Sequence, residues 1–307
     1  MLANTKTILE KAKRGGYAIG HFNINNLEMA QGIVQAAENL KSPVILATSE
    51  GAIEYAGINF LFSMAFTASE LSQVPIALHL DHGKDLKIIK QAIELGYSSV
   101  MFDGSHLPFE ENVRLTKQVV QLAHRRGVSV EAELGTIGGK EDLVHSRGII
   151  YTDPEKAKEF VKRTGCDFLA VAIGTSHGAY KFKGSAKLKI DLLKKIRDKV
   201  KIPLVLHGAS GVPSVMVKMA EKYGAKLEGV KGVPDYEIKL AIKKGISKIN
   251  TDTDLRIAFD AGVRKAVKES PQDFDPRHIL GEARDLIRKV VEQRIKMFGS
   301  AGKGLRC

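Results

Sequence analysis

Short apolar runs alternate along the chain with longer segments whose apolar residues recur every three or four positions. The first pattern is typical of buried strands, and the second is typical of amphipathic helices. Strands are predicted at residues 17–25, 43–49, 75–80, 98–103, 128–133, 168–174, 203–206 and 246–250. Helices are predicted before the first strand and at residues 27–40, 60–72, 86–95, 109–126, 154–164, 188–200, 217–223, 236–244, 254–269 and 283–297.

The regular alternation of strand and helix predicts an α/β fold, a single (β/α)8 TIM barrel with extra C-terminal helices. We expect one domain over residues 1–307, because no linker or low-complexity segment divides the chain. The long insertions are expected after strands five and seven. Asp153 followed by Pro154 indicates a helix start, with an N-cap residue and a proline at the first helical position.

Composition narrows the class of partner. The net charge is +12, from 47 Lys+Arg against 35 Asp+Glu, and such an excess attracts nucleic acid, membrane surfaces or small anions. The basic residues are spread out and aromatic residues are only 6%, so no stacking platform for bases is indicated, and phosphorylated small molecules fit the charge. No signal peptide and no apolar stretch of ~20 residues is present, so we expect no membrane segment. Two distant cysteines, Cys166 and Cys307, favour the reducing cytoplasm.

Polar and ionisable residues gather at the C-terminal ends of the predicted strands. They are Asn23, Ser49, Asp81, His82, Asp103, Glu133, His177, His207 and Asn250. In barrels of this kind that end is the catalytic face. The distribution therefore predicts a catalytic rim.

Three of these residues, His82, His177 and His207, are histidines from separate strands. Three neutral imidazoles with an open fourth position are typical of a catalytic zinc site. The alternative is that one or more of them is a hydrogen-bonded histidine that stabilises a loop. His79 and Asp81 precede His82 on the same strand; together they suit a metal and a proton carrier, or else form a solvated turn at the strand end.

Glycine-rich turns at residues 177–181 and 207–211 follow strands six and seven. Glycines there let backbone N–H groups approach an anion closely, although any one glycine taken singly is more often a tight turn. Residues 250–253 open a helix, whose N-terminus favours a phosphate. Residues 135–147 form a long, charged, glycine-rich segment, which predicts a mobile lid carrying Glu141. Taken alone, such an acid is more often solvated.

Taken together, these blocks resemble the class II, metal-dependent fructose-1,6-bisphosphate aldolases. The resemblance covers nearly the whole chain. It rests on residues 22–26, 79–83, 130–135, 174–182, 206–211 and 250–256, in that order. It implies a lyase that cleaves fructose 1,6-bisphosphate reversibly to dihydroxyacetone phosphate and glyceraldehyde 3-phosphate, as in glycolysis and gluconeogenesis.

The resemblance also implies roles for individual residues. His82, His177 and His207 would bind the catalytic Zn²⁺. Asp81 would move the proton of the substrate's C4 hydroxyl, and Glu141 would exchange the proton at C3. The substrate-binding positions would be Asn23, Ser49, Gly178, Lys181, Gly208, Ser210, Asn250, Asp252 and Thr253. His79, Asp103 and Glu133 would be accessory metal ligands or would support the ligands. A monovalent cation (Na⁺ or K⁺) and a dimer or tetramer with contacts through the C-terminal helices are further expectations.

Three alternatives stay open at this point. The first is cleavage of tagatose 1,6-bisphosphate, which differs in one hydroxyl. The second is a metal-dependent hydrolase on the same barrel, which would use a metal-bound water. The third is a basic nucleic-acid-binding protein, although the ordered chemistry of the rim argues against it. A lysine Schiff base, the other route to aldol cleavage, is disfavoured because residues 168–173 carry no lysine and Lys248 has no visible partner arrangement.

Overall fold

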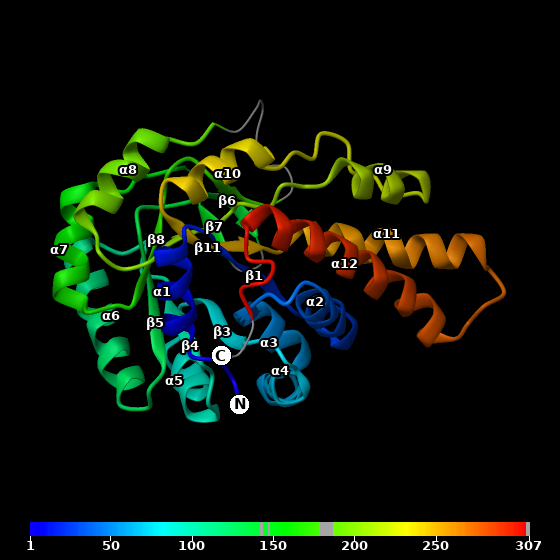
Figure 1. Ribbon diagram of the computed structural model, residues 1–307, viewed down its shortest axis with the longest axis horizontal. Helices are drawn as coiled ribbons and strands as arrows, with labels where there is room; N and C mark the ends of the chain where they lie inside the picture. Colours follow the sequence, from blue (N-terminus) through cyan, green and yellow to red (C-terminus); the bar gives the residue numbers. More distant parts are fainter. Residues whose placement is uncertain (142–143, 147, 179–186, 305–307) are drawn as a thin grey trace.

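The fold is built around one closed barrel of parallel strands (Figure 1). A computed structural model describes residues 1–141, 144–146, 148–178 and 187–304. The barrel strands are β1 (Ile19–Asn23), β2 (Val44–Ser49), β3 (Ile76–Gly83), β4 (Ser99–Phe102), β5 (Ser129–Leu134), β8 (Phe168–Val171), β10 (Leu204–Leu206) and β11 (Ile246–Thr251). They are joined in the order β1-β11-β10-β8-β5-β4-β3-β2, and β1 pairs with β2 to close the ring. The predicted TIM barrel is confirmed.

Helices follow the strands and surround the barrel (Figure 1). They are α1 (Thr5–Gly15), α2 (Leu27–Asn39), α3 (Glu50–Ala56), α4 (Ile58–Leu71), α5 (Leu86–Leu95), α6 (Phe109–His124), α7 (Pro154–Thr164), α8 (Ile190–Lys199), α9 (Ser214–Lys222), α10 (Asp235–Lys243), α11 (Thr253–Glu269) and α12 (Pro276–Phe298). The prediction missed α3 and began the last helix too late. In Figure 1, α11 and α12 project to one side of the barrel, and α12 also packs against α2.

Local sequence explains where several helices begin. Asp153 is the N-cap of α7 as predicted, and its Oδ1 accepts a hydrogen bond of 2.8 Å from the backbone N–H of Lys156. Asp275 caps α12 in the same way, with Pro276 at its first position. Ser49 ends β2 and also caps α3, so strand and helix join without an intervening loop.

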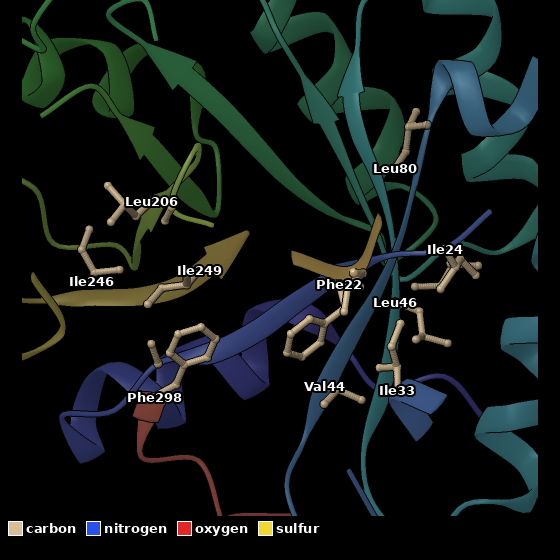
Figure 2. Close-up of a cluster of buried hydrophobic side chains, with 14 of the residues drawn as sticks. Phe22, Ile24, Ile33, Val44, Leu46, Leu80, Leu206, Ile246, Ile249 and Phe298 are labelled. Carbon is tan, nitrogen blue, oxygen red and sulfur yellow. The ribbon is translucent and has the colours of Figure 1, made fainter. Parts of the chain in front are cut away.

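Two apolar cores hold the barrel in place. The larger one lies between the strands and the surrounding helices, and Figure 2 shows part of it, including Phe22, Leu46 and Phe298. The smaller one contains alternate side chains of the strands, such as Ile45 and Phe168, together with residues of α1. Full burial of a side chain of this size stabilises the fold by about 1.5–3 kcal/mol. Helix α1 thus packs against the apolar part of the strands, whose C-terminal ends carry the polar residues.

A second, smaller sheet forms from segments that follow the barrel strands. It consists of β6 (Gly138–Glu141), β7 (Val144–Ser146) and β9 (Ser176–His177), in the order β7-β6-β9. The sequence predicted a lid over residues 135–147 but no strands within it, whereas β6 and β7 form an antiparallel pair there. Among the described residues, none of the helices combines the length and apolar character that crossing a bilayer requires.

Candidate active site

A cavity lies at the C-terminal ends of the barrel strands. It is lined by Asn23, Ser49, Glu50, Gly51, Asp81, His82, Lys84, His177, His207, Gly208, Ser210, Asn250 and Asp252. All of these except Glu50, Gly51 and Lys84 were singled out from the sequence. The strand-end rule therefore brings together residues that lie far apart along the chain.

The three predicted histidine ligands are neighbours in this cavity. The ring centroid of His82 lies 5.0 Å from that of His177 and 4.6 Å from that of His207, and the rings meet edge to face. The Nε2 atom of His82 and the Nδ1 atom of His207 are only 2.9 Å apart. Asp81 belongs to the same group, because Asp81, His82 and His207 each offer one possible ligand atom and these three atoms lie within 4.8 Å of one another.

Carboxylates behind the rings decide which nitrogens face each other. His82 Nδ1 lies 2.8 Å from Asp103 Oδ2, and His207 Nε2 lies 2.6 Å from Glu131 Oε1. A carboxylate only accepts hydrogen bonds, so each of these ring nitrogens carries a proton. In the neutral rings the facing atoms, His82 Nε2 and His207 Nδ1, then have lone pairs pointing at one another, and the arrangement suits a shared cation.

The charge balance of the pair agrees with this reading. Burial alone lowers the pKa of His82, but the carboxylates of Asp81 and Asp103 raise it to about 10. Burial and the positive charge of His82 hold the pKa of His207 well below its usual range. The carboxylates of Asp81 and Asp103 therefore favour a positive charge at this pair, which a bound metal ion would supply. The donor set fits Zn²⁺, which binds imidazole nitrogen readily.

Asp81 is held in position by two amide side chains. Asn23 Nδ2 donates to Asp81 Oδ2 at 3.0 Å, and Asn250 Nδ2 donates to Asp81 Oδ1 at 3.1 Å. The carboxylate is buried and lines the cavity beside His82. Each of its two oxygens thus accepts an amide hydrogen bond, and Oδ1 also lies 3.6 Å from Nε2 of the buried His21. This is a suitable arrangement for a group that accepts and returns a proton.

The loops after β10 and β11 are tied to each other. Gly208 has φ of +60°, and a Cβ there would lie 2.7 Å from the backbone oxygen of Ser176, so only glycine fits. Ser210 Oγ accepts a hydrogen bond of 3.4 Å from the backbone N–H of Asp252. Thr253 begins α11 immediately afterwards, and a helix N-terminus attracts anions. These loops therefore suit a phosphate.

Other predicted residues lie around the cavity or outside the described part. Gly178 is partly exposed just after β9. The backbone of Glu141 ends β6, whereas its side chain falls in the segment that is not described, and Lys181 also lies outside the described residues. Asp103 and Glu133 form a second group with His82 that could hold a metal ion. Burial and the nearby Asp103 charge raise the pKa of Glu133 well above its usual range.

A buried polar layer beneath the cavity was largely missed from the sequence. His79, Glu131 and Lys248 are each 0% exposed, and so is His21. His79 Nδ1 lies 2.7 Å from Ser99 Oγ, and His79 groups with His21 and Asp81 rather than with His82. The alternation of side chains along the strands could have revealed this layer from the sequence. His21, His79, Glu131 and Lys248 each stand two positions before a rim residue on the same strand, and alternate residues share a face.

The comparisons with known proteins all match aldolases. The family model described as fructose-bisphosphate aldolase class-II matches residues 3–303. A fructose-bisphosphate aldolase from Giardia intestinalis is 50% identical over 304 residues, covering 98% of this chain and 94% of that protein. One from Thermus caldophilus is 48% identical over 305 residues, covering 99% and 100%. The crystal structure of the YdjI aldolase from Escherichia coli K12 is similar with a TM-score of 0.81 at 38% identity, covering 99% of this chain and 100% of that one.

Proposed function

Because this chain belongs to the class II fructose-bisphosphate aldolase family, we propose that it cleaves fructose 1,6-bisphosphate reversibly to dihydroxyacetone phosphate and glyceraldehyde 3-phosphate. His82, His177 and His207 would hold the catalytic metal, which we propose is Zn²⁺. The observation that carries this assignment is the distance of 2.9 Å between a ring nitrogen of His82 and one of His207. The other nitrogen of each ring is hydrogen-bonded to a carboxylate.

Aldol cleavage breaks the bond between C3 and C4 of the sugar, and its electron pair stays on C3 beside the carbonyl. A metal bound at the three histidines supplies Lewis-acid stabilisation of the negative charge on the enediolate oxygens. The chain's own residues must then handle two protons, one at the C4 hydroxyl and one at C3. They must also hold the two phosphates in fixed positions.

Asp81 is the proposed acceptor of the C4 hydroxyl proton. Its carboxylate lines the cavity and is held by the amides of Asn23 and Asn250, so its orientation is already fixed when the substrate arrives. As the C4–O bond becomes the aldehyde carbonyl, the proton passes to an Asp81 oxygen. General acid–base catalysis of this kind typically contributes ~10²–10⁴-fold to the rate.

Glu141 is the proposed donor of the proton that quenches the charge at C3. The support for this role is its position on β6, which pairs with the strand that carries His177. A carboxylic acid brought over the cavity can protonate C3 of the enediolate and take the proton back in the condensation direction. The reaction is then balanced, because Asp81 gains one proton and Glu141 supplies the other.

The proposed substrate contacts surround this centre. Gly178, Gly208 and Ser210 lie in the loops after β9 and β10, and Asp252 and Thr253 lie at the start of α11. With Lys181 they would bind a phosphate and hydroxyls, while Asn23 and Ser49 face the cavity from the other side. Asn250 would contact the middle of the sugar.

A Schiff-base mechanism is disfavoured. Lys248 is the one lysine in the described barrel strands, and its ammonium is engaged by Glu131 Oε2 at 2.8 Å and by Asn250 Oδ1 at 2.9 Å. An imine requires a neutral amine that can reach the substrate carbonyl. This lysine is fully buried below the cavity instead.

The test of the proposed substrate is a comparison of kcat/KM for fructose 1,6-bisphosphate and tagatose 1,6-bisphosphate. The two sugars differ in one hydroxyl, so the ratio reports the few hydrogen bonds that read it. We expect the fructose sugar to be preferred. A higher kcat/KM for the tagatose sugar would change the substrate but not the chemistry, and turnover of neither would contradict the proposed function.

The proposal extends to the setting of the enzyme. We propose a cytoplasmic enzyme of glycolysis and gluconeogenesis that acts as a dimer or tetramer, with Na⁺ or K⁺ as an accessory cation. The projecting pair α11 and α12 offers a surface for contacts between copies (Figure 1). Sugar bisphosphate and triose phosphates would be its small-molecule partners, and we propose no role in nucleic-acid or membrane binding.

A further inference from the structure

Lys248 occupies an unusual place for a lysine, fully buried inside the barrel. Its Nζ lies 2.8 Å from Glu131 Oε2 and donates a hydrogen bond of 2.9 Å to Asn250 Oδ1. Burying an ammonium carries a large desolvation penalty, and a well-packed apolar side chain is often at least as stabilising. Both partners of Lys248 contact groups of the candidate active site, so its contribution can lie in the geometry of that site.

The first connection runs through Glu131 to His207. Glu131 Oε1 lies 2.6 Å from His207 Nε2, while Glu131 Oε2 takes the ion pair with Lys248. The carboxylate keeps the proton on His207 Nε2 and leaves Nδ1 bare toward His82. Lys248 supplies the positive charge beside this fully buried carboxylate.

The second connection runs through Asn250 to Asp81. The oxygen and nitrogen of an amide side chain are nearly the same size, so either could face either neighbour. The ammonium of Lys248 only donates and therefore selects Asn250 Oδ1. The carboxylate of Asp81 only accepts and therefore selects Nδ2, at 3.1 Å. The amide is thus held in one of its two orientations.

We propose that Lys248 is a positioning residue, and that its single ammonium sets both the proton position on His207 and the amide orientation of Asn250. Through them it prepares the metal-binding nitrogen and the proton carrier Asp81 from below the cavity. This inference deepens the proposed function, on which the role of Asp81 rests. A competing explanation is that Lys248 only neutralises Glu131.

The first test is Lys248→Met, which keeps a long side chain and removes the ammonium. We expect zinc affinity, measured by competition with a chelator of known affinity, to fall roughly 10- to 100-fold, as for the loss of other groups that orient metal ligands. We expect kcat for fructose 1,6-bisphosphate at saturating zinc to fall about 10²-fold, the effect of a small misplacement of catalytic groups. Wild-type values for both would overturn the proposal.

The double variant Lys248→Met/Glu131→Gln separates the two explanations and leaves no unpaired buried charge if the single variant fails to fold. The introduced amide oxygen can still accept from His207 Nε2, so zinc affinity should return to within about threefold of wild type. The orientation of Asn250 is still not selected, so kcat should stay low. Recovery of kcat together with zinc affinity would overturn the proposal in favour of simple neutralisation.

Lys6→Met is the matched control, because Lys6 also pairs with a buried carboxylate, that of Asp167, at 3.0 Å but from α1. It should leave zinc affinity and kcat within about threefold of wild type. Equal losses in this control would mean that both readouts follow general stability, and the proposal would fail. If the wild-type protein did not catalyse aldol cleavage, the proposed function would be contradicted. The zinc titrations of the variants would still test the role of Lys248.

Discussion

Asp81 and His82 are adjacent on β3, yet both line the cavity. Successive residues of a regular strand point to opposite faces. The regular pattern breaks here, because the pairing of β3 with β4 shifts register between Leu80 and Gly83 and His82 has φ of 48°. A positive φ at a residue other than glycine carries a conformational strain of order 1–3 kcal/mol. The hydrogen bond from the His82 ring to Asp103 offsets part of this strain. The irregularity places Asp81, the proposed proton carrier, beside His82, a proposed metal ligand.

The role of Asp81 gives the clearest prediction for a single residue. Asp81→Asn keeps the shape of the side chain but removes its basicity, so kcat should fall by ~10²–10⁴-fold. The zinc content should stay at the wild-type level. Steady-state kinetics and metal analysis of the same preparation check both expectations.

Asp85→Asn is the control for this change, since Asp85 caps α5 at the exposed surface and asparagine caps equally well. A near-wild-type kcat in Asp81→Asn would remove Asp81 from proton transfer. Loss of the metal would instead make Asp81 a ligand.

The rim residues were predictable because each follows the end of an apolar run, where one face of the barrel begins. The partners that orient them were harder to see. Lys248 pairs with Glu131, which stands on β5 while Lys248 stands on β11, and the two strands are not neighbours in the barrel. Strand periodicity puts both side chains inside, but only the closed shape of the barrel shows that they meet.

At the level of elements, β6 connects the predicted lid to His177, a proposed metal ligand. Gly138 and Gly139 pair with Ser176 and His177 of β9, and Ser176 Oγ donates to the backbone oxygen of Gly138 at 2.9 Å. The sequence predicted a lid here but not its strands, because the glycine-rich segment lacks the alternating apolar residues by which strands are recognised. Helix α3 was not predicted for a different reason, because it is short and follows β2 without a turn.

Gly139→Ala tests whether this pairing positions His177. Gly139 has φ of +95°, and a Cβ there would lie 2.3 Å from the backbone oxygen of His177, so β6 and β9 must move apart. We expect zinc affinity to fall roughly tenfold or more in a chelator competition titration.

Gly148→Ala is the matched control, because a Cβ at Gly148 meets nothing within 4 Å. It should bind zinc like the wild type. Unchanged affinity in Gly139→Ala would separate the lid sheet from the metal site.

For the whole molecule, the periodicity of the chain was enough to predict the barrel. The predicted strands all appear, because parallel strands buried on both faces are nearly continuous apolar runs. The sequence placed the start of the last helix at residue 283, whereas α12 begins at Pro276, directly after the Asp275 cap. Apolar cores lie on both sides of the strands, and the polar chemistry is confined to the C-terminal rim and the buried polar layer just beneath it.

Metal binding should also change the stability of the whole molecule. A ligand that binds only the folded state stabilises it by about 2.7 kcal/mol at a free concentration 100 times its Kd. We therefore expect added zinc to raise the free energy of unfolding, measured in urea, by about this amount over the metal-free protein. His207→Ala should abolish the increase, and an equal increase in that variant would place the metal elsewhere.

The central claim is that this barrel uses a metal held by His82, His177 and His207 to cleave a sugar bisphosphate. The most direct measurement is the rate of fructose 1,6-bisphosphate cleavage by protein treated with chelator, before and after zinc is returned. The account predicts that cleavage is lost with the metal and restored with it. Full activity in chelator, accompanied by an imine that borohydride traps on the protein, would contradict it.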